Sequence, residues 1–409
     1  MFRSRSAGPC PTAIHASTSR APRFPSRRTE MKSTSSHPFA APSQRGFTLI
    51  ELMVGLVLGM LTVLVITQVL ALAEGKRRAI TMGGDAQING SLSIFALQRD
   101  IQQAGYGAAA SPDALGCPVT RQFDVSGTST TFTLAPVLIT DGGSGGAPDT
   151  ITILQSNTPN FSTPMLLMGN HAQTDDHFTV SSSLNASVGN LMIAVPKTQS
   201  ASAGCALFSV TNDTSAATTT LSSTNVPHVA GAGPLTKWNQ SAVFPTGGYE
   251  AGSYLLNMGS MVLRSYSIDQ LSLKTDDFTP TSTAVTSSVL YPQIVNLQAF
   301  YGKDTNGDGI VDAYDTVLPT TSAGWMQVLT IRIAVVARSN QYEKDAVTGD
   351  TIPWDIGTTS TFTNLTPATC PNGTSKCLPL KINHVTEWAH YRYKVYDTIV
   401  PLRNVIWNS

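Results

Sequence analysis

The sequence predicts an α+β protein in which one long N-terminal α-helix, transmembrane in its first half, packs against a β-rich globular head. The segment Phe47–Ala73 is apolar, with Glu51 as its single charged residue, and roughly 20 apolar residues suffice to cross a bilayer as a helix. From Ser111 onward, short β-type runs alternate with clusters of Ser, Thr, Gly, Asn and Pro, which is typical of strands and loops. We therefore assign residues 1–46 to a leader, 47–105 to the helix and 106–409 to the head.

The first 46 residues predict a leader rather than a folded element. They are rich in Arg, Ser and Pro and show no apolar periodicity. Met31 opens a shorter basic segment that ends at Gly46, and we hypothesise that Met31 is the true start of the chain. The basic residues before the apolar segment, including Arg45, predict that this end of the helix stays on the cytoplasmic side. No second apolar run of that length follows, so we expect a single-pass protein.

Glu51 requires an explanation because it lies inside the apolar segment. An ionisable side chain at the centre of a membrane helix costs about 2.5–3.5 kcal/mol on insertion scales. A plain signal anchor with a chance Glu is the simpler alternative, but such carboxylates are rare. The sequence should therefore contain a partner for Glu51.

The residues Gly46-Phe47-Thr48-Leu49-Ile50-Glu51 resemble the type IV prepilin signature, a class III signal peptide. In that signature a Gly precedes the cleavage site, an aromatic residue comes first in the mature chain, and a Glu stands fifth. The resemblance implies cleavage after Gly46 by prepilin peptidase and N-methylation of Phe47. It also implies that Glu51 meets the free amine of Phe47 on a neighbouring subunit, which would remove the unpaired charge.

The helix is expected to continue past the membrane segment and to end at Gly105-Tyr106-Gly107. Two apolar stripes at helical spacing predict a band that the head covers. The stripes are Ile88, Leu92 and Phe95, and Ile94, Leu97 and Ile101.

Three passages are similar to PilW-type minor pilins. They are Ser91–Gly107, with its Arg-Asp pair followed by Ala-Gly-Tyr; Val295–Gly302, followed by an acidic loop; and the tail Tyr391–Tyr396 leading to Val400–Asn404. The middle, from Cys117 to Ser288, resembles nothing we can name. The resemblance implies a minor pilin that primes type IV pilus assembly in a minor-pilin complex at the tip, with the helix as its spine. It implies interaction rather than catalysis, so we expect no enzyme.

The resemblance also implies partners and a location. The partners would be other minor pilins, the major pilin, prepilin peptidase, the inner-membrane assembly platform and a tip adhesin. Nucleic acid is not expected, because the formal net charge of +0 offers phosphates no attraction. The chain would span the inner membrane once with its head in the periplasm, and would then join the cell-surface pilus. The alternatives are a minor pseudopilin of type II secretion, an anchored secreted hydrolase and an uncleaved bitopic adhesin.

The head is expected to be one β-rich domain or two lobes. Candidate strands are Thr131–Leu134, Thr150–Leu154, Phe178–Ser181, Leu191–Val195, Ala206–Val210, Tyr254–Asn257, Met261–Ile268, Leu271–Lys274, Ile294–Tyr301, Met326–Ala337 and Tyr391–Val400. Two Ser/Thr-rich stretches, Lys197–Val226 and Thr279–Ser288, are interpreted as surface loops.

Four of the five cysteines lie after the export signal, which favours disulfides in an oxidising compartment. Three pairings are possible. We favour Cys370–Cys377, whose short loop contains the turn sequence Pro-Asn-Gly, and therefore Cys117–Cys205. Free buried thiols are the alternative.

The acidic loop from Asp304 to Asp315 fits the template of a calcium-binding loop. Its oxygen ligands stand at positions 1, 3, 5, 7, 9 and 12, with Gly309 at the sharp turn at position 6. The candidate ligands are Asp304, Asn306, Asp308, the Ile310 carbonyl, Asp312 and Asp315. Asp315 is shorter than the usual Glu, which predicts weaker binding. A structural calcium ion is the single cofactor suggested, none is required, and a solvated Asp/Asn/Gly turn is the alternative.

Other motifs are weak. Gly142–Gly146 contains the nucleophile-elbow string, but no buried strand leads into it and no amphipathic helix follows, so we interpret it as a hairpin loop. His384 and His390 flank Glu387 at spacings that do not match a helical zinc site.

Overall fold

The structure, a computed structural model, describes residues 46–143, 146–159, 163–200, 203–363, 365–371 and 373–406, and of residues 78–83 it describes the backbone alone. The leader up to Arg45, with the alternative start at Met31, lies outside the described residues. The chain divides into two compact units, residues 1–67 and residues 68–409.

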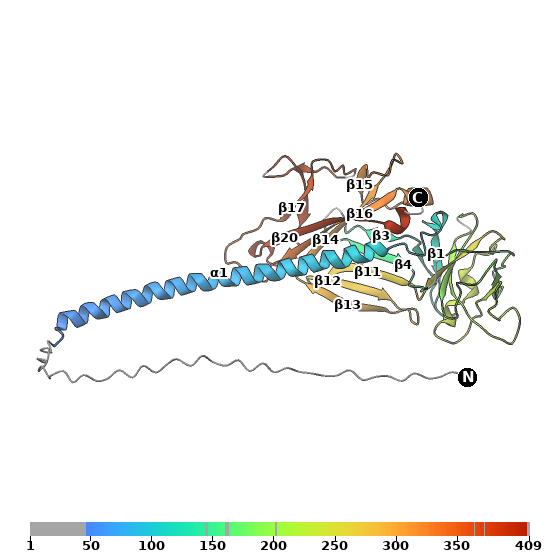
Figure 1. The fold of residues 1–409 in the computed structure, drawn as a ribbon, viewed down its shortest axis with the longest axis horizontal. Helices are drawn as coiled ribbons and strands as arrows, with labels where there is room; N and C mark the ends of the chain where they lie inside the picture. The colour runs from blue at the N-terminus through green and yellow to red at the C-terminus, as the bar shows by residue number, and fades with distance from the viewer. Residues whose placement is uncertain are drawn as a thin grey trace, which may run out of the picture. The chain divides into compact units, whose positions relative to one another are not determined.

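A single long helix, α1, covers Leu49–Gln103, within two residues of the predicted bounds at each end. Its segment Leu49–Arg77 is long and apolar enough to cross a membrane, with a mean hydropathy of 2.6. Everything that follows α1 is strands, turns and short helices (Figure 1). The predicted α+β class is therefore confirmed.

The strands form two larger sheets and three smaller ones. The six-stranded sheet has the order β2 (Thr130–Thr133), β1 (Pro118–Arg121), β8 (Cys205–Ser209), β7 (Leu191–Val195), β10 (Tyr254–Gly259) and β5 (Met165–Leu166). The five-stranded sheet has the order β13 (Val285–Pro292), β12 (Ser272–Phe278), β11 (Val262–Asp269), β4 (Thr150–Gln155) and β3 (Val137–Thr140).

The last third of the chain supplies most of the remaining elements. A four-stranded antiparallel sheet has the order β15 (Ala313–Asp315), β14 (Ile294–Lys303), β16 (Val328–Arg338) and β20 (Tyr393–Pro401) (Figure 1). The others are a sheet of β17 (Thr351–Gly357), β19 (Lys376–Lys381) and β18 (Ala368–Thr369), and a pair of β6 (His177–Thr179) and β9 (Asn225–Pro227). The short helices are α2 (Ser322–Met326), α3 (Arg403–Ile406) and four 3₁₀ turns, Pro112–Ala114, Thr236–Trp238, Ser241–Val243 and Trp388–His390.

Each candidate strand has a counterpart in this list, including β16 for the long run Met326–Ala337 and β20 for the tail. Both loop assignments are wrong in part, and Thr279–Ser288 contains the start of β13. All but one of the residues of β13 are exposed, so no apolar alternation marks it. It becomes a strand through its hydrogen bonds to β12. The other predicted loop, Lys197–Val226, contains β8 and the start of β9.

The head covers one side of the helix. Leu97 and Ile101 are fully buried, and Ile94 packs against the same core. The other predicted stripe is exposed, with 57% of Ile88, 41% of Leu92 and 62% of Phe95 accessible to solvent. The prediction of one apolar band covered by the head is therefore wrong for this stripe, because the head reaches around one face alone.

A buried carboxylate near the end of α1 joins the helix to the five-stranded sheet. Asp100 is 5% exposed. Its Oδ2 accepts hydrogen bonds from Arg264 Nη1 and Tyr266 Oη, each at 2.7 Å. Arg264 and Tyr266 both belong to β11, and Arg264 also pairs with Asp277 on β12. Asp100 is the second residue of the Arg-Asp pair identified in the sequence. The pair therefore contains the residue that attaches α1 to β11.

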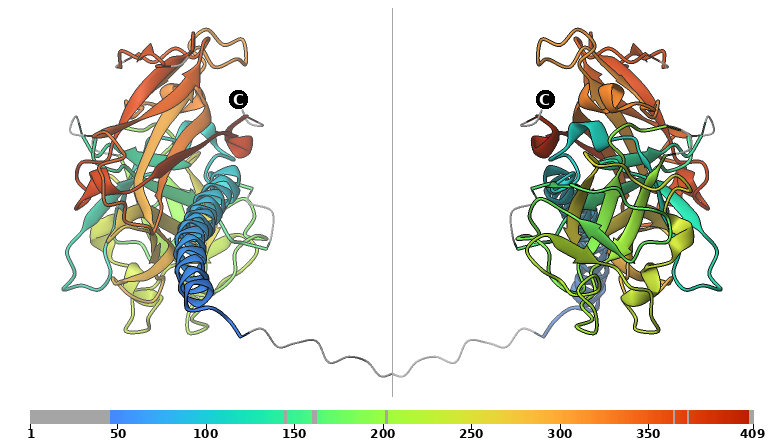
Figure 2. Two further views of the ribbon diagram at one scale, coloured as in Figure 1. Left: turned by 90° about the vertical axis from the view of Figure 1, so that its left-hand side faces the viewer. Right: turned by 90° about the vertical axis from the view of Figure 1, so that its right-hand side faces the viewer.

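The helix ends as the sequence predicts. Gly105 and Gly107 adopt left-handed conformations, with φ of +78° and +83°, which glycine adopts without strain. Asn404 in α3 donates hydrogen bonds from Nδ2 to the carbonyls of Gln103 and Ala104, which lack partners within the helix. The red tail thus lies beside the end of α1 (Figure 2).

Both favoured disulfides are present. Cys117 is bonded to Cys205 and Cys370 to Cys377. The first joins two neighbouring strands of the six-stranded sheet, β1 and β8. The second links cysteines seven positions apart in the sequence, of which Cys377 lies in β19.

The head also contains a buried histidine pair, His171 and His228, that the sequence does not reveal. The Nε2 atoms of His171 and His228 lie 2.9 Å apart among Phe178, Phe208 and Phe244. Burial lowers the pKa of His171 to about 4 and lowers that of His228 well below its usual value. Both rings are therefore neutral in the folded protein at neutral pH.

Replacing Asp100 with Ala should destabilise the full-length protein in detergent by about 2–4 kcal/mol, because a buried charge pair loses one partner while Arg264 keeps Asp277. Thermal unfolding measures this. Arg99→Ala is the matched control, since the Arg99 side chain is 62% exposed and its contact with Asp100 should contribute less than about 1 kcal/mol. Equal effects of the two changes would contradict the anchor.

Acid should weaken the fold through the histidine pair. With the folded pKa below the unfolded value, the unfolded chain gains protons first as the pH falls below about 6.5. The free energy of unfolding should therefore fall between about pH 6.5 and pH 4, by on the order of 3 kcal/mol for His171. Denaturant unfolding across this range measures the slope, which replacing both histidines with Phe should reduce. A control change at His384, which hydrogen-bonds the Val295 carbonyl, should leave the slope intact.

Candidate functional site

The first turn of α1 holds the predicted processing and assembly residues. Gly46 and Phe47 precede the helix, and Phe47 is 89% exposed. Glu51 Oε2 accepts hydrogen bonds from the backbone N–H of Thr48 at 3.0 Å and from its hydroxyl at 2.9 Å, while the Thr48 hydroxyl oxygen lies 3.3 Å from the Glu51 nitrogen. These reciprocal bonds are a capping box.

Sequence reasoning missed the role of Thr48. The signal was available, because a Thr followed three residues later by a Glu before an apolar run is the capping-box pattern. The box gives the Glu51 carboxylate two local donors. Both donors are neutral, and within the described residues no cation pairs with Glu51.

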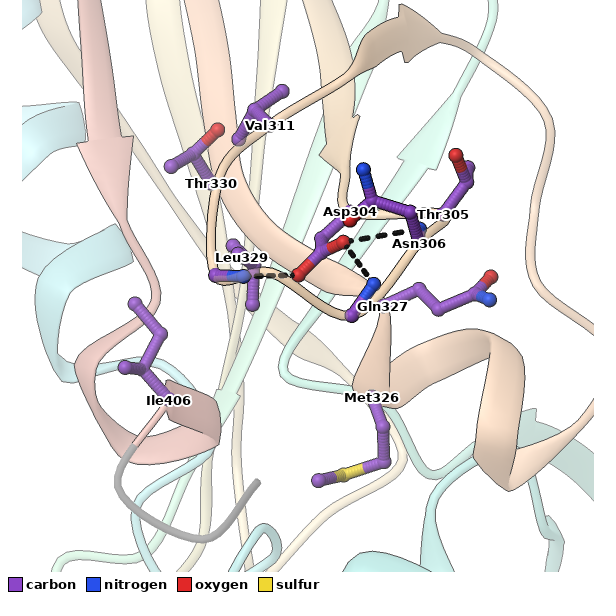
Figure 3. Close-up of a pocket in the computed structure, with 11 residues that line it drawn as sticks. Asp304, Thr305, Asn306, Val311, Met326, Gln327, Leu329, Thr330 and Ile406 are labelled. Carbon is purple, nitrogen blue, oxygen red and sulfur yellow. Dashed lines mark hydrogen bonds between the residues drawn. The ribbon is translucent and has the colours of Figure 1, made fainter.

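The acidic loop is organised around Asp304, which is 6% exposed. Its carboxylate accepts backbone N–H bonds from Asn306, Gly307 and Gly309, at 3.2, 2.6 and 2.7 Å (Figure 3). Burial acts to raise the pKa of Asp304, but these hydrogen bonds outweigh it and hold the pKa below its usual value. Gly307 and Gly309 are both left-handed, with φ of +82° and +81°, in keeping with the sharp turn expected at Gly309.

The remaining loop carboxylates also bind donors of the loop itself. Asp312 accepts from the backbone N–H and hydroxyl of Thr305, at 2.8 and 2.7 Å. Asn306 Nδ2 lies 3.3 Å from both Asp308 and Asp312, so these three side chains converge. Asp308 in turn accepts from the backbone N–H of Ile310 at 2.8 Å.

Asp315 lies apart from the other predicted ligands. It belongs to β15, and its carboxylate forms a 2.7 Å ion pair with Lys303 on β14. In the part of the chain that the structure describes, no three His, Cys, Asp or Glu side chains are grouped closely enough to hold a metal ion. The geometry therefore offers a loop closed by its own hydrogen bonds, and calcium remains a proposal.

A groove of about 670 Å³ adjoins the loop (Figure 3). Its walls are the loop, the start of β16 and the C-terminal α3. The lining residues include Asp304, Asn306, Met326, Gln327, Leu329 and Ile406. Its polar lining consists of the loop groups, which already bind one another, and of Gln327 and Thr330 near the start of β16. Among these lining residues no nucleophile has an adjacent base.

The other motifs do not form sites. His384 Nε2 hydrogen-bonds the Val295 carbonyl and His390 Nδ1 that of Glu343, at 2.9 and 2.8 Å. The two imidazole rings therefore hydrogen-bond to different backbone segments. Of the glycine-rich string 142–146, residues 144 and 145 lie outside the described residues.

Comparison with known proteins gives two family matches. Residues 261–404 match the family Type IV Pilus-assembly protein W. Residues 42–67 match the prokaryotic N-terminal methylation motif. With an apolar helix at the methylation motif and a β-rich head behind it, the chain is a membrane-anchored type IV pilin. The match over residues 261–404 supports a pilin of the PilW type. The methylation motif implies processing by prepilin peptidase and association with pilus components.

A solved type IV-like pilin from Thermus thermophilus is 12% identical to this chain and covers 53% of it and 88% of its own length, with a TM-score of 0.19. At this TM-score the structural similarity supports no conclusion about the chain. No curated protein matches. The families that do match are structural pilins rather than enzymes.

If the acidic loop binds calcium, the mature full-length protein in detergent should release or absorb heat when titrated with the ion, at a dissociation constant of about 10⁻⁴–10⁻³ M. Asp308→Ala should abolish that heat by removing a ligand from the convergent group. Asp315→Ala is the matched control and should leave the heat unchanged, because its carboxylate binds Lys303. Absence of heat at millimolar calcium would end the proposal.

Proposed function

We propose that this PilW-type pilin is a minor pilin that primes assembly of the type IV pilus within a minor-pilin complex at the tip. The observation that carries the proposal is the apolar stripe of Ile88, Leu92 and Phe95 on α1. The stripe lies beyond Arg77, where the membrane-length segment ends, and its side chains are 41–62% exposed. Adjacent large apolar side chains left exposed in water favour a protein partner.

A helix from a neighbouring pilin is the partner that fits this stripe best. The stripe has helical spacing, and helices bury such stripes against other helices. It follows the apolar membrane segment on the same helix, so a partner anchored in the same membrane could contact both in turn.

The first turn of the helix supports the same proposal. The Glu51 carboxylate has neutral donors from Thr48 but no cation among the described residues. In a membrane, an unpaired carboxylate is costly. Cleavage after Gly46 would create an amine at Phe47, and the amine of an adjacent subunit would give Glu51 its charged partner. A subunit out of register would leave both charges unpaired in lipid.

The rest of the proposal follows from membership of the pilin class. The head would lie in the periplasm before assembly and on the cell-surface pilus afterwards. The contacts would be with other minor pilins, the major pilin, the inner-membrane platform and a tip adhesin, and the role would be interaction rather than catalysis. A pseudopilin of type II secretion would use the same helix, so the experiment below scores both outcomes.

Phe95→Ser should reduce the number of surface pili while leaving the thermal unfolding of the purified protein within about 0.5 kcal/mol of the original, as is usual for exposed positions. Ser91→Ala on the same helix is the matched control and should leave piliation unchanged, because Ser91 bonds to its own helix. Glu51→Ala, which removes the carboxylate, should also reduce piliation.

The result that would refute the proposal is normal piliation in both the Phe95 and the Glu51 variants. Loss of protein secretion with pili intact would instead assign the chain to type II secretion. Leu97→Ala serves as a stability reference, since emptying a fully buried site costs about 2–5 kcal/mol.

A further inference from the structure

A pocket of about 280 Å³ lies where the edge of the six-stranded sheet meets the five-stranded sheet. Strands β1 and β2 contribute Arg121 and Thr130 to its wall, and β11, β12 and β13 contribute the opposite side. Its lining residues come from two parts of the chain, residues 121–238 before the matched PilW region and residues 263–285 at the start of that region. It is separate from the groove beside the acidic loop.

Arg121 is the distinctive residue of this pocket. Its guanidinium carbon lies 5.3 Å from the centroid of the Phe132 ring and 5.6 Å from that of Phe278, so the cation sits between two aromatic faces. Its Nε donates to Thr130 Oγ1 at 3.2 Å. Among the described residues, no carboxylate forms an ion pair with Arg121, and its two terminal nitrogens make no hydrogen bond.

Burial lowers the pKa of Arg121, and no neighbouring acid counteracts the effect. Desolvation of a cation without an opposing charge disfavours its charged form. The guanidinium is therefore partly dehydrated, and its two terminal nitrogens bond to no protein group among the described residues.

The acids closest to this region already have partners. Asp276, which also lines the pocket, pairs with Lys274 at 3.3 Å and accepts a hydrogen bond from Ser287. Asp124 pairs with Lys237 at 2.9 Å. These two acids therefore pair with lysines, and neither pairs with Arg121.

We propose that this pocket binds an organic carboxylate with a compact apolar body. The planar guanidinium presents parallel N–H donors that match the two oxygens of a carboxylate. Apolar side chains, among them Phe123, Leu263 and Phe278, also line the pocket and would contact the body of the ligand. This combination of apolar walls and a few polar groups is typical of small-molecule sites.

The size of the pocket limits the ligand. At about 280 Å³ it lies just below the usual range for ligand pockets, roughly 300–1,000 Å³. One sugar ring or one amino-acid side chain fits that space. The indole N–H of Trp238 already donates to the Pro280 carbonyl at 2.6 Å, so the pocket offers Arg121 as its cationic donor.

The test is calorimetric titration of the mature full-length protein in detergent with benzoate as the probe. Benzyl alcohol, which has the ring without the charge, and acetate, which has the charge without the ring, should bind at least about tenfold more weakly than benzoate. Glucuronate and N-acetylglutamate then distinguish an acidic sugar from an acidic amino acid as the source of the carboxylate.

The variants assign the effect to the guanidinium. Arg121→Gln should weaken benzoate binding at least about tenfold, and Arg121→Lys should weaken it less because it keeps the charge without the fork. Arg392→Gln is the control, since Arg392 is exposed and pairs with Glu343 outside the pocket. Circular dichroism and thermal unfolding confirm that each variant is folded.

Equal binding of benzoate to the original protein and to Arg121→Gln would overturn the proposal. So would the absence of binding by benzoate, glucuronate and N-acetylglutamate at millimolar concentrations. In that case Arg121 would serve the packing of Phe132 and Phe278 alone. Piliation is not the readout, so the outcome is independent of the proposed role in assembly.

Discussion

The structure depends on a buried carboxylate, Asp100, that fixes the end of a membrane-anchored helix to its head. Its oxygen accepts short hydrogen bonds from Arg264 and Tyr266 on one strand, and Arg264 is held in turn by Asp277. Charged groups in a dehydrated position have few satisfactory geometries. The network therefore fixes both the depth and the rotation at which α1 meets the five-stranded sheet.

The rotation of α1 against the head determines which of its side chains remain exposed to solvent. With Leu97 and Ile101 turned into the core, the stripe containing Ile88 and Phe95 remains exposed. The same helix carries the prepilin motif at its start, where Thr48 and Glu51 cap the first turn. The helix therefore packs one face against the head and leaves another apolar face exposed to solvent.

In the head, polar side chains that match a ligand-binding motif form hydrogen bonds and ion pairs within the protein itself. The acidic loop has the spacing of a calcium site, yet Asp304 accepts three backbone N–H groups and Asp315 binds Lys303. Elsewhere in the head, the Arg121 guanidinium lies near the rings of Phe132 and Phe278 and has no carboxylate partner among the described residues. No local pattern around Arg121 indicates this, because Phe132 and Phe278 reach it from different strands.

The sequence by itself determined the helix and its membrane segment, the processing motif, the two disulfides and the strands with strong apolar patterning, such as β16. Hydrophobic length, fixed offsets and short spacings can be read along the chain. The exception is Cys117–Cys205, whose members are 88 residues apart and were paired because Cys370 and Cys377 pair with each other. The tertiary structure alone decided that β13 is a strand, that one apolar stripe of α1 stays exposed, and that His171 meets His228. Each of these depends on pairing or packing between segments far apart in the chain, and no local pattern records which partner a residue will meet.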